Sequence, residues 1–149
     1  MPVIFIPQGR LNMIGGEMLW VGVAMVSATV QTMASADRDA ILDAARIPVV
    51  EELGKPPVFV VRQLNRDGEW AFLFADMQQQ GGAPYDYGGT RKAEAARQGY
   101  VSRSYAALLR KGEGGWRVVE AAIGPTDAAW EGWAAKYGAS STLFVFDAQ

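Results

Sequence analysis

The chain has 149 residues, is 50% hydrophobic and 20% charged, and so has the composition of one globular domain with a hydrophobic core. Its formal net charge is −2 and no basic patch stands out, which argues against a nucleic-acid partner. It has no Cys and no His, so disulfides, thiolate nucleophiles, Cys/His zinc sites and Ser-His-Asp triads are excluded. We expect no cofactor and no metal site.

Residues 18–33 carry no charge, and the small residues Ala34, Ser35 and Ala36 follow them. An apolar run that ends in such a triplet is typical of a secretory signal peptide, which would be cut after Ala36. The run could instead be a buried helix, or an uncleaved anchor in a membrane or against a partner; it is short for a spanning helix, which needs about 20 residues. We therefore separate residues 1–36, as a signal peptide or apolar N-terminal helix, from a single domain over residues 37–149.

An amphipathic helix is predicted to follow, with Asp37 or Ser35 as its cap. Pro48 lies within it, so either the helix kinks there or one helix ends near Arg46 and a short turn restarts at Pro48. Gly54 is the predicted stop. Apolar residues at spacings of three and four mark the face that would be buried: Ile41, Leu42, Ala45, Val49, Val50 and Leu53.

Two β-branched and aromatic runs, residues 58–64 and 69–77, flank Asn65-Arg66-Asp67-Gly68, which is the pattern of a β-hairpin. A type I turn with Gly68 in a left-handed bulge position is favoured, and it would pair Asn65 with Glu69. A two-residue turn at Asp67-Gly68 would shift every pair by one. The second strand is apolar on both faces, which predicts a central position in its sheet.

Residues 78–90 are rich in Gln and Gly and predict an irregular loop, after which residues 91–98 predict a short polar helix. Tyr85 and Tyr87 in this loop resemble the adaptable contact residues of a binding surface, although an ordered loop without that role is the commoner case. A second hairpin is predicted from residues 104–110 and 116–123, with its turn in residues 112–115.

A second helix is expected over residues 127–136, capped by Thr126 and stopped by Gly138. Trp130, Trp133 and Tyr137 lie on one face of it. Such a stripe could be a stacking platform for a ligand, but burial in the core is the favoured interpretation. The apolar tail, residues 143–146, is expected to dock as an extended segment.

These elements predict an α+β fold in which a four-stranded antiparallel curved sheet, made of two hairpins, is packed by an N-terminal and a C-terminal helix. The order of a helix followed by a four-stranded meander resembles the cystatin-like and NTF2-like groups of folds. A second resemblance, to a set of uncharacterised bacterial secreted proteins, covers about residues 37–145. That resemblance implies export, and it supplies no reaction or ligand. The segments that carry it are residues 40–46, 59–61, 70–72, 105–110, 116–119 and 123–127.

Arg62, Asp76 and Glu120 are charges inside apolar strands, and a buried charge needs a partner. NTF2-like enzymes use carboxylates and Tyr in a sheet-lined pocket, so that resemblance implies Asp76 or Glu120 as a base with Tyr105 as a hydrogen-bond donor. The alternative is that these charges lie at strand ends or on a solvated face. Arg62, Asp76, Tyr85, Tyr105 and Glu120 are the candidate ligand-binding residues; none is assigned as catalytic.

We expect a non-enzymatic, exported domain that binds a small molecule or a protein. One alternative is a lyase or isomerase with a hydrophobic pocket in the curved sheet, and another is an accessory subunit of a membrane complex anchored by residues 18–33. A periplasmic or secreted location is expected, with the cytoplasm as the alternative. Membrane contact is expected only through residues 18–33, and a homodimer is left open.

Overall fold

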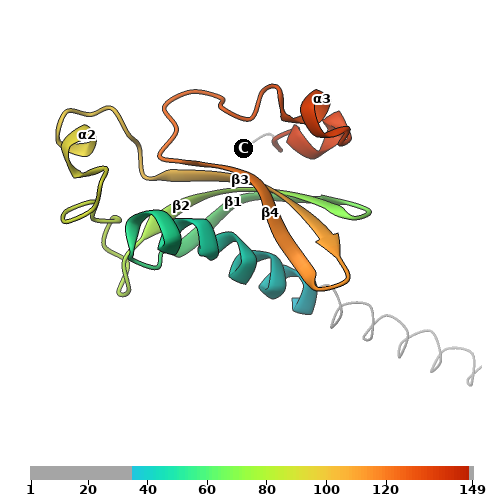
Figure 1. Ribbon diagram of the computed structural model, residues 1–149, viewed down its shortest axis with the longest axis horizontal. Coiled ribbons are helices and arrows are strands. Elements are labelled where there is room, and N and C mark those ends of the chain that lie inside the picture. Colours follow the sequence, from blue (N-terminus) through green and yellow to red (C-terminus); the bar gives the residue numbers. More distant parts are fainter. Residues whose placement is uncertain (1–34, 148–149) are drawn as a thin grey trace, which may run out of the picture. The chain divides into compact units, whose positions relative to one another are not determined.

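Residues 35–147 are described by the structure, a computed structural model (Figure 1). A helix over residues 35–53 comes first, and residues 39–147 belong to one compact unit. Four antiparallel strands form one sheet in the order β1-β2-β3-β4, which confirms the predicted α+β class and its two hairpins. The elements after the first helix are β1 (Val58–Asp67), β2 (Trp70–Gln78), α2 (Ala93–Arg97), β3 (Ser104–Gly112), β4 (Gly115–Ile123), α3 (Trp133–Tyr137) and the 3-10 helix η1 (Ser141–Phe144).

Both faces of the sheet are covered. Residues 39–53 of the first helix lie across one face, and α3 with η1 lies on the other (Figure 1). Successive strand residues point to opposite faces, so β2 and β3 supply side chains to two separate cores. Ala71, Leu73 and Met77 pack under the helix, whereas Phe72 packs under α3. The prediction that the second strand is central and buried on both faces is confirmed.

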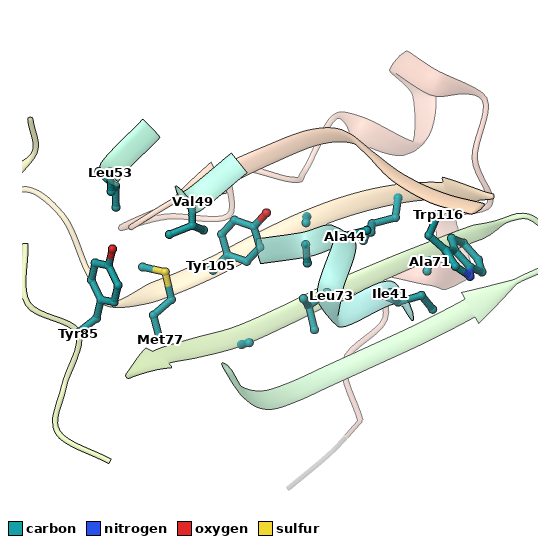
Figure 2. Packing of buried hydrophobic residues seen from close by; sticks show 14 of the residues in the cluster. Ile41, Ala44, Val49, Leu53, Ala71, Leu73, Met77, Tyr85, Tyr105 and Trp116 are labelled. Atoms are coloured by element: carbon teal, nitrogen blue, oxygen red, sulfur yellow. The ribbon is translucent and has the colours of Figure 1, made fainter. Parts of the chain in front are cut away.

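The first helix buries the predicted face with one exception. Ala45, Val49 and Leu53 lie one turn apart and are 0%, 0% and 6% exposed in the helix–sheet core. Figure 2 shows Val49 and Leu53 in that core. Val50 was predicted to join them and is 41% exposed, because it lies about 100° around the helix from Val49. The helical backbone continues through Pro48, so the alternative of a helix end near Arg46 is wrong. Gly54 ends the helix as predicted, with φ 78° and an N–H that donates to the Val50 carbonyl.

The first hairpin turns at a different place from either predicted turn. Asp67 pairs with Trp70, so the loop is the two residues Gly68 and Glu69, and both predicted registers are wrong. Gly68 has φ 60° in the first loop position, and a loop of this kind matches the right-handed twist of the strands better than a type I turn does. Asn65 consequently pairs with Phe72 rather than Glu69.

A bulge then interrupts β1 between Val61 and Gln63. The extra residue is Arg62, and it allows Val61 and Leu64 to pack against the same helix–sheet core although they are three positions apart. The predicted loop, short helix and second hairpin are confirmed, with α2 at Ala93–Arg97 and β4 paired along β3.

The C-terminal helix is shorter than predicted, since α3 begins at Trp133 and not at Asp127. Residues 128–132 form turns instead, in which the Glu131 N–H donates to the Ala128 carbonyl at 3.0 Å. Gly132 directly precedes α3, and glycine is among the weakest helix formers. The predicted stop at Gly138 is confirmed, with φ 69°.

The tail docks as predicted but not in the predicted conformation. Leu143 is 1% exposed, yet it lies in η1 and not in an extended segment. Extended backbone starts at Val145, and β1 holds it through side chains: the Asn65 amide donates to the carbonyls of Leu143 and Val145 at 2.7 and 2.8 Å. The buried Gln63 accepts from the Asp147 N–H at 3.1 Å.

No helix within residues 35–147 is both long and apolar enough to cross a membrane. Residues 18–33, the apolar run of the predicted signal peptide (residues 1–36) or anchor, lie outside the described residues.

Candidate functional site

Arg62 and Asp76 meet across the first hairpin. The guanidinium Nη1 donates to the Asp76 Oδ2 at 2.8 Å, and the Ser104 hydroxyl reaches Asp76 Oδ1 at 3.4 Å. Their side chains are 48% and 38% exposed, so this is a partly solvated ion pair near the end of β2. Ion pairs of this exposure contribute less than about 1 kcal/mol, and neither charge is buried without a partner.

Glu120 lies on β4 and ties that strand to α3. Its Oε1 accepts from Lys136 Nζ at 2.8 Å and from the Tyr137 hydroxyl at 2.6 Å. The hydrogen bond from Lys136 and then that from Tyr137 hold the pKa of Glu120 below its usual range. The same pair raises the pKa of Lys136. This contact links β4 to α3, and it occupies the Glu120 carboxylate with two hydrogen bonds.

Tyr105 is sealed in the core between the helix and the sheet (Figure 2). It is 0% exposed, and its ring stacks on Phe59 with centroids 5.2 Å apart. Its hydroxyl has no hydrogen-bond partner among the described residues, and burial raises its pKa.

The loop tyrosines are core residues as well. Tyr85 and Tyr87 are 2% and 3% exposed, and their rings meet edge to face at 5.3 Å. The Tyr85 hydroxyl donates to the Lys55 carbonyl at 2.8 Å, and the Tyr87 hydroxyl donates to the Ser102 carbonyl at 2.5 Å. Burial raises the pKa of Tyr85, and it raises that of Tyr87 to about 12. Their hydroxyls fasten the loop to the segment after the first helix and to the segment before β3, and Tyr85 offers little surface to a ligand.

The structure does not bring the five candidates together. Asp76 pairs with Ser104 and Glu120 with Leu108, so both carboxylates lie on the face covered by α3. Tyr105 packs into the core on the opposite face. Because neighbouring strand residues alternate between faces, the sheet itself separates the predicted base from the predicted donor.

A shallow hollow of about 250 Å³ lies beside α3 and η1. Trp130 was predicted to lie in the core, and Glu131 was not among the predicted site residues. All residues that line the hollow fall within residues 128–144, and it depends on the turn at residues 128–132, where a continuous helix was predicted. The lining residues are Ala128, Trp130, Glu131, Ala134, Ser141 and Phe144.

Trp130 is half-buried and stands at the edge of an aromatic cluster. Its ring centroid lies 5.2 Å from that of Phe74, 5.7 Å from Phe146 and 5.8 Å from Phe72. Trp133 of the predicted stripe is 4% exposed, which confirms core burial for that residue, and Tyr137 packs against the same core. Rings held by several neighbours lose little further freedom when a ligand stacks on them.

No group of three or more acidic side chains that could hold a metal ion occurs in the described part of the chain. Comparison with protein-family models, with curated proteins and with solved structures gives no match in any of the three cases. The resemblances to cystatin-like and NTF2-like folds and to bacterial secreted proteins therefore stay predictions.

Proposed function

We propose that this chain is a non-enzymatic, exported α+β domain that binds a partner at its surface, with the hollow beside α3 as the contact point. The observation that carries the proposal is the filling of both faces of the sheet. Residues 39–53 with the strands form one core, and α3, η1 and Phe72 form the other. A pocket for catalysis inside a curved sheet needs an open concave face, and here side chains occupy both faces.

The candidate polar residues do not come together at one site, and this supports the same proposal. Asp76 is engaged by Arg62, Glu120 is engaged by Lys136 and Tyr137, and Tyr105 lies across the sheet from both. A general base and its donor must both reach one substrate atom, and these groups do not converge. The hollow, by contrast, offers half-buried aromatic surface at the outside of the molecule.

Partner binding is tested by co-purification from the native host, with the full chain carrying an epitope in the exposed turn at residues 112–115. The matched variants are Glu131→Lys in the hollow and Glu113→Lys in that distant turn, because both reverse one exposed charge. We expect a component that is lost with Glu131→Lys, is retained with Glu113→Lys, and binds the purified chain directly with the same dependence. Direct binding that Glu131→Lys leaves unchanged would contradict the assignment of this surface.

Export is tested by the intact mass of the protein recovered from its host. We expect a mass that corresponds to a chain starting at Asp37, since cleavage after Ala36 is predicted. A mass that includes residues 1–36 would contradict the exported form and would favour the anchor or the cytoplasmic alternative.

A further inference from the structure

We infer that the hollow beside α3 binds a cationic side chain, arginine above all, presented by the partner protein. This inference rests on the proposed function, which assigns partner binding to that surface. Three features of the hollow carry it: its aromatic walls, its charge and its size.

The walls supply a π-surface. Trp130 and Phe144 both line the hollow, and Trp130 is held by Phe74 and Phe146 with centroids 5.2 and 5.7 Å away. Phe144 is in turn held by Phe72 at 4.8 Å. A cation within about 6 Å of an aromatic centroid is attracted by the ring quadrupole, and Trp is the strongest such partner.

The charge of the hollow is negative. Glu131 is its charged lining residue, and its exposed carboxylate has no ion-pair partner within residues 35–147. Lys136, the basic residue of α3, is engaged by Glu120 at 2.8 Å and does not line the hollow. Asp127, exposed in the segment before α3, adds a second negative charge nearby in the chain. A carboxylate beside an aromatic ring discriminates a cation from a neutral group of the same shape.

The size favours a single side chain. A volume of about 250 Å³ is below the range of about 300–1,000 Å³ that is usual for pockets that enclose small-molecule ligands. Arginine is favoured over lysine because its flat guanidinium can stack on Trp130 while its N–H groups donate to Glu131. Ser141 also lines the hollow, and a serine hydroxyl can accept a further hydrogen bond.

The test uses N-acetyl-arginine amide as the probe and N-acetyl-citrulline amide as its neutral isostere. The indole N–H signal of Trp130 is followed by NMR in the full chain and is assigned through Trp130→Phe, because the chain has five Trp. We expect a saturable shift with the arginine probe and about threefold or more weaker binding of the citrulline probe. Glu131→Gln should remove that preference, and Glu113→Gln should preserve it.

Three outcomes would contradict the inference. Equal binding of arginine and citrulline probes at Trp130 would remove the cationic preference and leave surface binding of a partner intact. Absence of a Trp130 response to the arginine probe would reject a cation site, and the co-purification experiment would then decide separately whether a partner binds this surface. A preference that survives Glu131→Gln would likewise show that the carboxylate is not its source.

Discussion

Gly124 directly follows β4 and lies close to the loop segments that precede β3. Its φ is 71°, and a Cβ at this position would lie 2.9 Å from the Ser102 carbonyl oxygen and 2.9 Å from the Tyr87 hydroxyl. We expect Gly124→Ala to lower the free energy of unfolding by about 2 kcal/mol or more, because backbone strain and a steric clash add. Urea unfolding monitored by Trp fluorescence measures the change.

The matched control is Gly68→Ala in the first hairpin turn. Gly68 has φ 60°, but nothing lies within 4 Å of a Cβ placed there. Its replacement should therefore cost only the conformational strain, about 1 kcal/mol. Equal losses for the two variants would mean that the contacts around Gly124 relax freely, contrary to the packing described for Tyr87 and Ser102.

The contact of Glu120 with Lys136 and Tyr137 predicts a pH dependence at acid pH. The folded pKa of Glu120 is lowered from 4.5, so the contact stabilises the fold above that pH and its contribution is lost as pH falls through the folded pKa. Glu120→Gln should therefore be less stable than the parent at pH 7, by no more than about 1 kcal/mol because the pair is partly exposed. The stabilities of the two proteins should converge once the pH has fallen below the lowered folded pKa of Glu120.

Unfolding of the parent and Glu120→Gln in urea, at neutral and acid pH, tests this expectation. Glu113→Gln is the control, since Glu113 is exposed in the 112–115 turn and should give a difference near zero at both pH values. A stability difference for Glu120→Gln that stays constant with pH would show that its ionisation does not support the α3–β4 contact.

At the scale of elements, the tail depends on side chains of β1 and not on backbone pairing. The Asn65 amide donates to both the Leu143 and Val145 carbonyls, and Gln63 contacts Asp147. We expect Asn65→Ala to lower the free energy of unfolding by about 1–2 kcal/mol, because two acceptors lose their donor. It should also accelerate trimming of the tail by carboxypeptidase more than it accelerates global unfolding. Arg117→Ala, an exposed change on β4, is the control and should do neither.

The same elements show where sequence patterns stop being informative. The two hairpins follow from β-branched and aromatic runs that flank glycine-containing turns, and these signals are local. The position of the first turn is less well determined, since Asn65–Glu69 contains several residues that favour turns. The observed register also depends on the bulge at Arg62 and on the hydrogen bonds between Asn65 and the tail. Neither feature can be recognised in the local sequence.

The extent of α3 was overestimated for a similar reason. Trp130, Trp133 and Tyr137 have helical spacing, yet Trp130 lies in a turn and packs against Phe74 and Phe146. Tertiary contacts of large aromatic side chains outweigh the small helix propensities of the residues between them. This error is the reason that the hollow was not predicted, because the hollow forms where a continuous helix was expected.

At the scale of the whole molecule, the alternation of side chains between the two faces explains why the central strand was predicted correctly and why the grouping of the polar residues was not. An apolar pattern on both faces of β2 predicted a central strand covered on two sides, which the structure confirms. It did not indicate which polar residues would share a face, since that depends on the register and on two bulges. Tyr105 was therefore grouped with Asp76 and Glu120 although the sheet lies between them.

The arrangement of the sheet predicts an order of hydrogen exchange. β2 and β3 are hydrogen-bonded to neighbours on both sides and lie between two cores, whereas β1 and β4 are the edges. Backbone amides that open only on global unfolding exchange most slowly, so β2 and β3 should exchange slowest, followed by β1 and β4, and the 79–90 loop fastest. Mass-spectrometric exchange of the full chain at two protein concentrations gives this order. If β4 exchanged as slowly as β3, and did so only at high concentration, a second copy would be pairing along the β4 edge, and the domain would have to be regarded as a homodimer.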